Sequence, residues 1–252
     1  MTSIDDLPRR SFAIVGEYRQ EILQDGDLKW IIGHGSNDPL ALLHEMNATG
    51  DSIHDFIVSK FTPGGTFLDI GAHVGHYSVR AAHAGMNVYS VEANPETVQQ
   101  LRLNCYLNKL NVTIWAFAAW DSRAIVEYHC IKDAKMRNGS ASLMPVDGYE
   151  PMGIVVAAWP LDEVCERLPA LDLIKMDVEG SDCHVLDGMM NTIIRHKPLL
   201  IFEDHSWTGQ YDFTEMRARE RKLEAFGYKW ADATAHGVRC PDRYRVGTPG
   251  ST

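Results

Sequence analysis

Residues 67–78 read Phe-Leu-Asp-Ile-Gly-Ala-His-Val-Gly-His-Tyr-Ser, and this stretch decides the fold of the chain. An apolar run that carries Asp69 is followed by a short turn with Gly71 and Gly75, and then by the start of a helical pattern. Glycine lets the backbone approach a ligand closely, and the N–H groups at a helix start favour anionic groups. Strand, glycine turn and helix in this order are the parts that seat a nucleoside-bearing cofactor.

The turn differs from the Gly-x-Gly-x-x-Gly turn of dinucleotide-binding folds. His73 occupies the position at which the backbone would approach a pyrophosphate, and its side chain would crowd that group. Glu92 ends the next apolar run, 21 residues after Gly71, where a carboxylate can accept both hydroxyls of a ribose. The alternative is a tight turn beside a solvated Glu92. The whole set in this order favours a cofactor that has a ribose but no diphosphate.

Beyond the turn, strand patterns alternate with helical patterns, which predicts an α/β fold with a doubly wound, mostly parallel sheet. One helix start is explicit, because Asn94 can cap a helix that has Pro95 at its first position. No periodicity is found over residues 132–153, which are therefore predicted to form a long loop. The predicted strands cover residues 66–70, 88–91, 112–118, 126–130, 173–176, 199–202 and 228–231, with a terminal strand within 238–246.

The chain is predicted to consist of an N-terminal cap or lid segment, residues 1–62, and one main domain, residues 63–252. Short strands near residues 12–15 and 30–32 and helices over 38–46 and 53–61 are expected within the cap. Pro63-Gly64-Gly65 ends the last of these helices. A chain of 252 residues is long enough for one domain with a substantial core.

The composition points to a cytoplasmic protein. Hydrophobic residues make up 45% and charged residues 23% of the chain, as in ordinary globular proteins. No apolar run approaches the roughly 18 residues of a membrane span, and the N-terminus lacks the order of a signal peptide. The cysteines are odd in number and widely spaced, so they predict reduced, mostly buried thiols: Cys105, Cys130, Cys165, Cys183 and Cys240.

The charge balance disfavours a nucleic-acid partner. The formal net charge is −10, and the basic residues are scattered along the chain. A protein that binds DNA or RNA normally carries a basic stripe that neutralises phosphates. The expected partner is instead a small molecule, and the oligomeric state is left open.

Three sequence motifs are similar to those of a known class. Residues 68–78 resemble the first motif of class I S-adenosylmethionine-dependent methyltransferases, and residues 91–95, Val-Glu-Ala-Asn-Pro, resemble the acidic second motif. Residues 173–180, Leu-Ile-Lys-Met-Asp-Val-Glu-Gly, are similar to a signature of the FkbM family within that class. The resemblance covers about residues 63–203. His73 departs from it, because Asn is common at this position.

The resemblance implies both a fold and an activity. The family's fold is a seven-stranded sheet with one reversed strand. Its methyl donor is S-adenosylmethionine, with S-adenosylhomocysteine as product, and the methyl group usually goes to a hydroxyl of a sugar, a polyketide or another secondary metabolite.

The resemblance also assigns cofactor-binding residues by position. The methionine moiety would be surrounded by residues of the turn and the helix start: Asp69, Gly71, Ala72, His73, Gly75, Tyr77, Ser78 and, from the later motif, Asp177. Glu92 would hold the ribose, with Ala93 and Asn94 beside the adenosine. Ala118, Ala119 and Trp120 would flank the adenine.

A hydroxyl acceptor needs a general base or a metal ion, because a protonated hydroxyl is a poor nucleophile. The catalytic candidates follow two predicted strands, at the sheet edge where doubly wound folds bind ligands: Asp177, Glu179 and His205. Asp177 could instead be a buried structural carboxylate, Glu179 part of a turn, and His205 a surface residue. Carboxylates and imidazole also suit a divalent metal, but no spacing motif requires one, and no residue is assigned as a metal ligand.

The sequence therefore predicts an S-adenosylmethionine-dependent O-methyltransferase that acts on a hydroxylated small molecule. Two alternatives are a nicotinamide-dependent oxidoreductase and a non-catalytic protein that retains the cofactor fold. The first would need room for a pyrophosphate at His73. The residues do not decide which of the three candidates is the base, or which acceptor is methylated.

Overall fold

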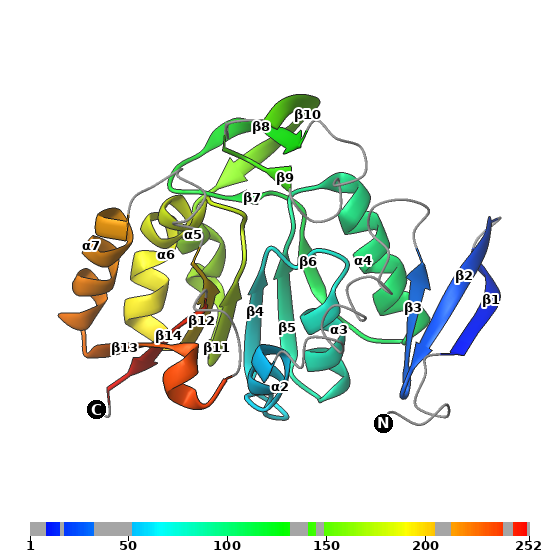
Figure 1. Cartoon of the computed structure of the whole chain (residues 1–252), viewed down its shortest axis with the longest axis horizontal. Coiled ribbons are helices and arrows are strands. Elements are labelled where there is room, and N and C mark those ends of the chain that lie inside the picture. The colour runs from blue at the N-terminus through cyan, green and yellow to red at the C-terminus, as the bar shows by residue number, and fades with distance from the viewer. Residues whose placement is uncertain are drawn as a thin grey trace.

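The structure is a computed structural model, and it describes residues 9–15, 18–32, 52–131, 141–144, 149–204, 213–238 and 244–250. At its centre is a seven-stranded sheet with the order β13-β14-β12-β11-β4-β5-β6 (Figure 1). Neighbouring strands from β6 to β12 are parallel, and β14 runs antiparallel to both β12 and β13. The sheet consists of β4 (Thr66–Ile70), β5 (Asn87–Val91), β6 (Thr113–Trp115), β11 (Leu173–Met176), β12 (Leu199–Glu203), β13 (Tyr228–Asp232) and β14 (Tyr244–Pro249).

This order confirms the predicted fold class, a doubly wound, mostly parallel sheet with one reversed strand. All residues of β4 and β11 are buried, as expected of parallel strands that are covered on both faces. Alternate residues of β4 enter different cores: Leu68 packs in one cluster with helix α6, and Phe67 in another with helix α3. The strands are thus fixed in register by apolar side chains on both faces.

The helices lie on either side of the sheet. α5, α6 and α7 gather near β11 and β12, and α3 and α4 near β5 and β6 (Figure 1). Their bounds are α2 (Ser52–Val58), α3 (His76–His83), α4 (Pro95–Leu107), α5 (Leu161–Val164), α6 (Asp182–His196) and α7 (Phe213–Glu224), with short 3-10 turns η3 (Cys165–Arg167) and η5 (Ala233–His236). None of the helices in the described part of the chain is long and apolar enough to cross a membrane.

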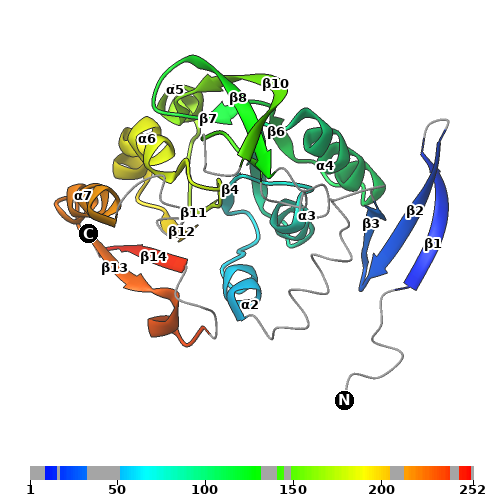
Figure 2. The same cartoon turned by 45° about the horizontal axis from the view of Figure 1, so that its top comes forward.

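A second sheet, of four strands, lies beyond the carboxyl ends of β4 and β5 (Figures 1 and 2). Its order is β7-β10-β8-β9, with β7 (Ala118–Ala119), β8 (Ala124–Ile131), β9 (Ala141–Ser142) and β10 (Tyr149–Trp159). The prediction of one long loop over residues 132–153 is wrong, since β9 and the start of β10 fall within it. Pro151 and Gly153 lie where the register with β8 shifts, and these two strand breakers concealed the strand.

The N-terminal strands form a third, antiparallel sheet: β1 (Arg9–Val15), β2 (Tyr18–Asp25) and β3 (Leu28–Ile32). β3 lies beside α4 (Figure 1), and the two are joined by side-chain amides. The buried amide of Asn104 accepts from Ile31 N–H at 2.9 Å and donates to the carbonyl of Val74 at 2.8 Å. This one residue therefore connects the N-terminal sheet to the turn that follows β4.

Two further predictions concern the chain outside the main sheet. The predicted helix over residues 38–46 lies outside the described residues, and the division into a cap and a main domain at residue 62 stays a prediction. Cys105, Cys165 and Cys183 are free and buried, as predicted for them.

Candidate active site

The two distant signature motifs meet at Gly71 and Asp177. Because β4 and β11 are parallel neighbours, their carboxyl ends lie side by side, and Asp177 N–H donates to Ile70 O at 3.0 Å. Gly71 has a φ of +72°, and a Cβ at this position would lie 1.8 Å from the carbonyl oxygen of Asp177. Only glycine satisfies both conditions. The turn predicted from the sequence is thus built against the strand end that carries Asp177.

Asp69, a residue of β4, is fully buried, and its side chain faces the start of α3. Its Oδ2 accepts a hydrogen bond from Ser78 Oγ at 2.5 Å, and Ser78 Oγ also lies 2.7 Å from Ser90 Oγ. Burial raises the pKa of Asp69, whereas the nearby Lys175 opposes this shift. The carboxylate thus ties the strand end to the first turn of α3 and holds the intervening glycine turn in place.

Lys175 is a site residue that was not predicted from the sequence. It is buried within β11, and its Nζ lies 3.6 Å from Asp69 Oδ1 and 3.4 Å from Asp177 Oδ2. The same ammonium donates to Gly71 O at 3.0 Å. Burial alone would lower the pKa of Lys175, but the two carboxylates raise it above its ordinary value. The signal in the sequence is a single basic residue in an otherwise apolar strand, two positions before the acid that ends it.

Glu92 directly follows β5, and its role as a ribose ligand stays a prediction. It is buried, and its Oε2 and Oε1 accept hydrogen bonds from His73 N–H and Asn94 N–H, both at 2.8 Å. Burial raises the pKa of Glu92, and these backbone bonds oppose the shift. The backbone N–H of Ala93 is a third donor to this carboxylate, which has about four acceptor sites, so capacity remains for a ligand hydroxyl. Ala93 lies between these bonds, next to the residue that caps α4.

Asn94 and Gly75 shape the two helix starts beside this carboxylate. Asn94 Oδ1 accepts from Glu96 N–H at 3.0 Å with Pro95 in the first turn, which confirms the predicted cap. Gly75 has a φ of +91°, and a Cβ there would lie 2.2 Å from Leu101 Cδ1 of α4. The second glycine of the turn is therefore needed for the close approach of α3 and α4.

His73 is the middle residue of the turn, between Ala72 and Val74. Its backbone is left-handed, with a φ of +51°, a conformation that Asn tolerates better than most residues. Burial lowers the pKa of His73 to about 4, and its other electrostatic neighbours are Asp177 and Lys175. The ring is therefore neutral at pH 7 and does not repel a cationic ligand by its charge.

The residues predicted to flank the adenine lie in and after β7. Ala118 and Ala119 are buried, and Trp120 stacks on His184 of α6 with ring centroids 4.1 Å apart and planes 9° apart. Gly188 permits this approach, because a Cβ there would lie 1.8 Å from Trp120 O. One face of the indole is thus covered by the protein, and its contact with an adenine stays a prediction.

A cluster of acidic and phenolic groups, Asp177, Glu203 and Tyr244, lies at the ends of three adjacent strands. Tyr244 OH donates to Glu203 Oε2 at 3.1 Å. Burial raises the pKa of Tyr244, and the charges of Asp177 and Glu203 raise it further. Tyr244 was missed from the sequence. Because β14 is reversed, its first residue lies at the edge where the parallel strands end. Tyr77 is close by, with Lys175 Nζ 5.5 Å from its ring centre.

Glu179 and His205 are the other two catalytic candidates. Glu179 has a φ of +49°, and its carbonyl accepts a hydrogen bond from Ser142 Oγ of β9 at 2.8 Å. His205 lies outside the described residues, so the identity of the base stays a prediction. Within the ranges that the structure describes, no group of three or more His, Cys, Asp or Glu side chains could hold a metal ion.

Several known proteins that are similar to this chain are methyltransferases. The family model described as the methyltransferase FkbM domain matches residues 69–230. A tRNA (guanine(37)-N(1))-methyltransferase of Cryptococcus neoformans is 36% identical over 61 residues, which are 24% of this chain and 11% of that protein. Its counterpart in Leishmania braziliensis is 35% identical over 57 residues, or 23% of this chain and 8% of that protein. The chain thus spans about a tenth of the length of the curated relatives that it matches.

Two solved structures of methyltransferases are similar to this chain. A methyltransferase FkbM from Methylobacillus flagellatus KT is similar with a TM-score of 0.49 and 16% identity, over 73% of this chain and 43% of that one. A precorrin-6y C5,15-methyltransferase from Geobacter metallireducens GS-15 has a TM-score of 0.46 and 14% identity, over 79% and 88% of the two chains.

Proposed function

The chain belongs to the FkbM methyltransferase family, and from this premise we propose that it methylates a hydroxyl group of a small molecule, such as a sugar or a secondary metabolite. The family makes it an S-adenosylmethionine-dependent methyltransferase. The acceptor class is our proposal. The single observation that carries it is the cluster of Asp177, Glu203 and Tyr244 at the strand ends, next to the cofactor turn.

The described residues fit the cofactor. The turn from Gly71 to Gly75 lies at the strand ends, and the carboxylate of Glu92 keeps acceptor capacity beside its backbone bonds. When bound, S-adenosylmethionine supplies an electrophilic methyl group on a sulfonium centre. Asp177 would place negative charge on the side of the methyl group, and Lys175 would offset part of that charge.

The cluster of Asp177, Glu203 and Tyr244 suits a hydroxylated acceptor. Carboxylate oxygens accept hydrogen bonds from hydroxyls, and a phenol can both donate and accept. In-line transfer depends mainly on holding the acceptor oxygen in position, so several such groups around one hydroxyl would orient it. Asp177 is the proposed base, because its side chain is 30% exposed at the strand end, while Lys175 fixes its position from the buried side. Glu179 and His205 remain alternatives for this role.

The proposal is tested by measuring transfer of a labelled methyl group from S-adenosylmethionine to a panel of glycosides and other hydroxylated small molecules. Asp177→Asn should lower turnover by about 100-fold or more, while the affinity for S-adenosylhomocysteine changes little. The matched control is Asp187→Asn on the outer side of α6, where the carboxylate pairs with Arg219. This control should keep its turnover.

A tRNA transcript belongs in the same panel, because the names of the curated relatives state that they act on guanine 37 of tRNA. The formal net charge of −10 disfavours such a polyanion. Methylation of tRNA without methylation of any small hydroxylated compound would overturn the proposed acceptor class. Calorimetric binding of NAD without binding of S-adenosylhomocysteine would favour the oxidoreductase alternative. Cofactor binding without transfer to any acceptor would favour the non-catalytic alternative.

A further inference from the structure

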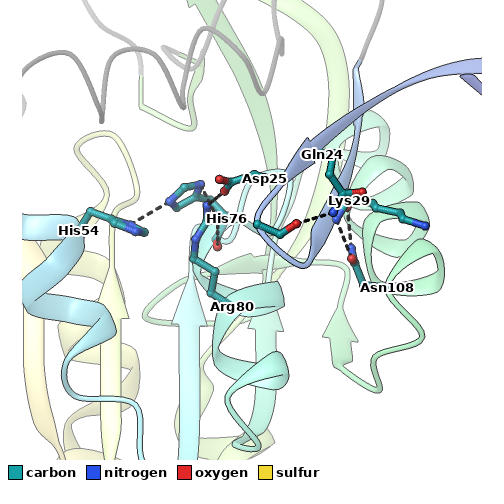
Figure 3. A network of polar contacts seen from close by, with 8 residues as sticks. Gln24, Asp25, Lys29, His54, His76, Arg80 and Asn108 are labelled. Carbon is teal, nitrogen blue, oxygen red and sulfur yellow. Dashed lines mark hydrogen bonds and ion pairs between the residues drawn. The ribbon is translucent and has the colours of Figure 1, made fainter. Parts of the chain in front are cut away.

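Four side chains form a continuous polar network from the N-terminal sheet to the helix that follows the cofactor turn (Figure 3). Asp25 of β2 pairs with Arg80 of α3 at 2.5 Å between Oδ2 and a guanidinium nitrogen. Arg80 lies 3.2 Å from His76 Nδ1, and His76 Nε2 lies 3.0 Å from His54 Nδ1 of α2. We call these four residues the histidine network. It joins the helices α2 and α3 to β2 of the N-terminal sheet.

The direction of every hydrogen bond in the histidine network is fixed by chemistry. Arginine has only donors, so His76 Nδ1 must accept, and the proton of the neutral His76 ring is on Nε2. His76 Nε2–H then donates to His54 Nδ1, which places the proton of His54 on its Nε2. Burial lowers the pKa of His54 to about 4 and that of His76 well below its ordinary value, so both rings are neutral at pH 7.

The network therefore ends in an N–H donor, His54 Nε2–H. Within the described residues, no group accepts a hydrogen bond from this nitrogen. The His54 ring centre lies 4.9 Å from that of His76 and 5.7 Å from that of Tyr77, and both of these residues are in the first turn of α3. Gly75 immediately precedes them, so the donor lies next to the turn that carries the cofactor-binding motif.

We propose that His54 Nε2–H binds the carboxylate of the cofactor's methionine moiety, an inference that rests on the proposed function. With the ribose at Glu92 and the methyl group at Asp177, the amino-acid end of the cofactor would lie on the side of α3. A carboxylate only accepts hydrogen bonds, and the fixed polarity of the network presents a donor. The same polarity rejects the ammonium group of that moiety, which would need a lone pair.

Asp25 and Arg80 act as positioning residues in this arrangement. Arg80 is largely buried, with its guanidinium 4.9 Å from the Trp30 ring centre, and burial lowers its pKa while the carboxylate of Asp25 opposes that shift. Asp25 thus keeps a buried cation in place. That cation in turn selects the tautomer of His76 and, through it, the tautomer of His54. The N-terminal sheet would therefore contribute to cofactor binding without touching the cofactor.

The test compares two ligands by calorimetry. S-adenosylhomocysteine has the amino-acid end, and 5′-methylthioadenosine has the same nucleoside and a thioether but lacks that end. His54→Ala should weaken binding of S-adenosylhomocysteine by about tenfold or more and change that of methylthioadenosine by less than about twofold. His54→Gln keeps an N–H donor and should recover part of the loss. Unchanged binding of methylthioadenosine also shows that the variant site is folded.

The matched control is His83→Ala, an exposed histidine in the last turn of α3, which should bind both ligands as the wild type does. Equal affinity of His54→Ala and the wild type for S-adenosylhomocysteine would overturn this inference alone. So would an equal weakening for both ligands, which would indicate a purely structural role. Failure of the wild type to bind S-adenosylhomocysteine would overturn the cofactor assignment and this inference together.

Discussion

Gly71 and Asp177 are in direct backbone contact, so that a Cβ on the glycine would lie 1.8 Å from the carbonyl oxygen of the aspartate. The contact joins the carboxyl ends of β4 and β11, which are neighbours in the sheet although they are far apart in the sequence. The position of Asp177 is therefore set by the turn that follows β4. A change in that turn should move the proposed base.

The contact predicts that Gly71→Ala destabilises the protein by about 4 kcal/mol or more, because left-handed strain and a backbone clash add together. Gly64→Ala separates the two effects. Gly64 also has a positive φ, of +81°, but no atom lies within 4 Å of its added Cβ. This control should cost only about 1–2 kcal/mol. Urea denaturation measures both variants, and equal losses would show that the clash is relieved by movement of the backbone.

Removing the buried ammonium of Lys175 should leave two carboxylates without compensation. Lys175→Met is expected to cost about 3–5 kcal/mol of unfolding free energy, since one partner of a buried ionic group is lost. Adding Asp177→Asn to this variant removes one of those carboxylates, so the double variant should recover about 1 kcal/mol or more. Chemical denaturation of both single variants and the double variant gives the coupling. A double variant as unstable as the sum of the singles would contradict the ion cluster.

Asn104 should be the main attachment of the N-terminal sheet. Asn104→Leu keeps the volume roughly but leaves the Ile31 N–H and the Val74 carbonyl without their partner, at a cost of about 2–3 kcal/mol. Amide exchange in β3 should accelerate, which hydrogen-exchange mass spectrometry measures. Asn108→Ala is the control, because its bonds to Lys29 are exposed. If both variants exchanged alike, burial of the amide would not matter to the attachment.

His73 should make stability depend on pH in the acid range. Its pKa is about 4 in the folded protein against an ordinary value of 6.5, so the unfolded chain binds the additional proton between these values. The contribution of His73 is complete above pH 6.5 and is lost as the pH falls toward 4. His73→Asn suits the left-handed backbone and does not titrate. Relative to this variant, the wild type should lose about 2 kcal/mol between pH 8 and pH 5.

The measurement for His73 is denaturant unfolding of both proteins at a series of pH values. The difference between the two curves isolates this residue, because Asp69 and Glu92 titrate alike in both proteins. A difference that is independent of pH would mean that the ring keeps its ordinary pKa in the folded protein, as a solvent-accessible imidazole does.

The central fold could be predicted because its strands are buried on both faces. A strand such as β4 is then a nearly continuous apolar run that ends in a glycine turn, and this pattern is visible without any partner. β10 was not predicted, because Pro151 and Gly153 lie at a register shift that only the pairing with β8 explains. The residue types of a segment do not predict which distant strand it pairs with.

The same distinction applies to the site. Gly71 and Glu92 directly follow β4 and β5, so their places at the strand ends could be predicted from the order of strand and turn. Lys175 acts through its register position opposite Asp69, and Tyr244 through the reversal of β14. Both depend on which strands are neighbours. The choice of base still depends on His205, which lies outside the described residues.

The reversed strand β14 also constrains how the protein can be made. It is the last strand of the sheet in chain order, yet it lies inside the sheet, between β12 and β13. During synthesis at about 5–20 residues per second, β13 leaves the ribosome before the strand that connects it to the rest of the sheet. Until residues 244–249 emerge, β12 is an open edge and β13 has no partner within the sheet. The nascent chain therefore depends on β14 to close a sheet whose glycine turn after β4 was synthesised long before.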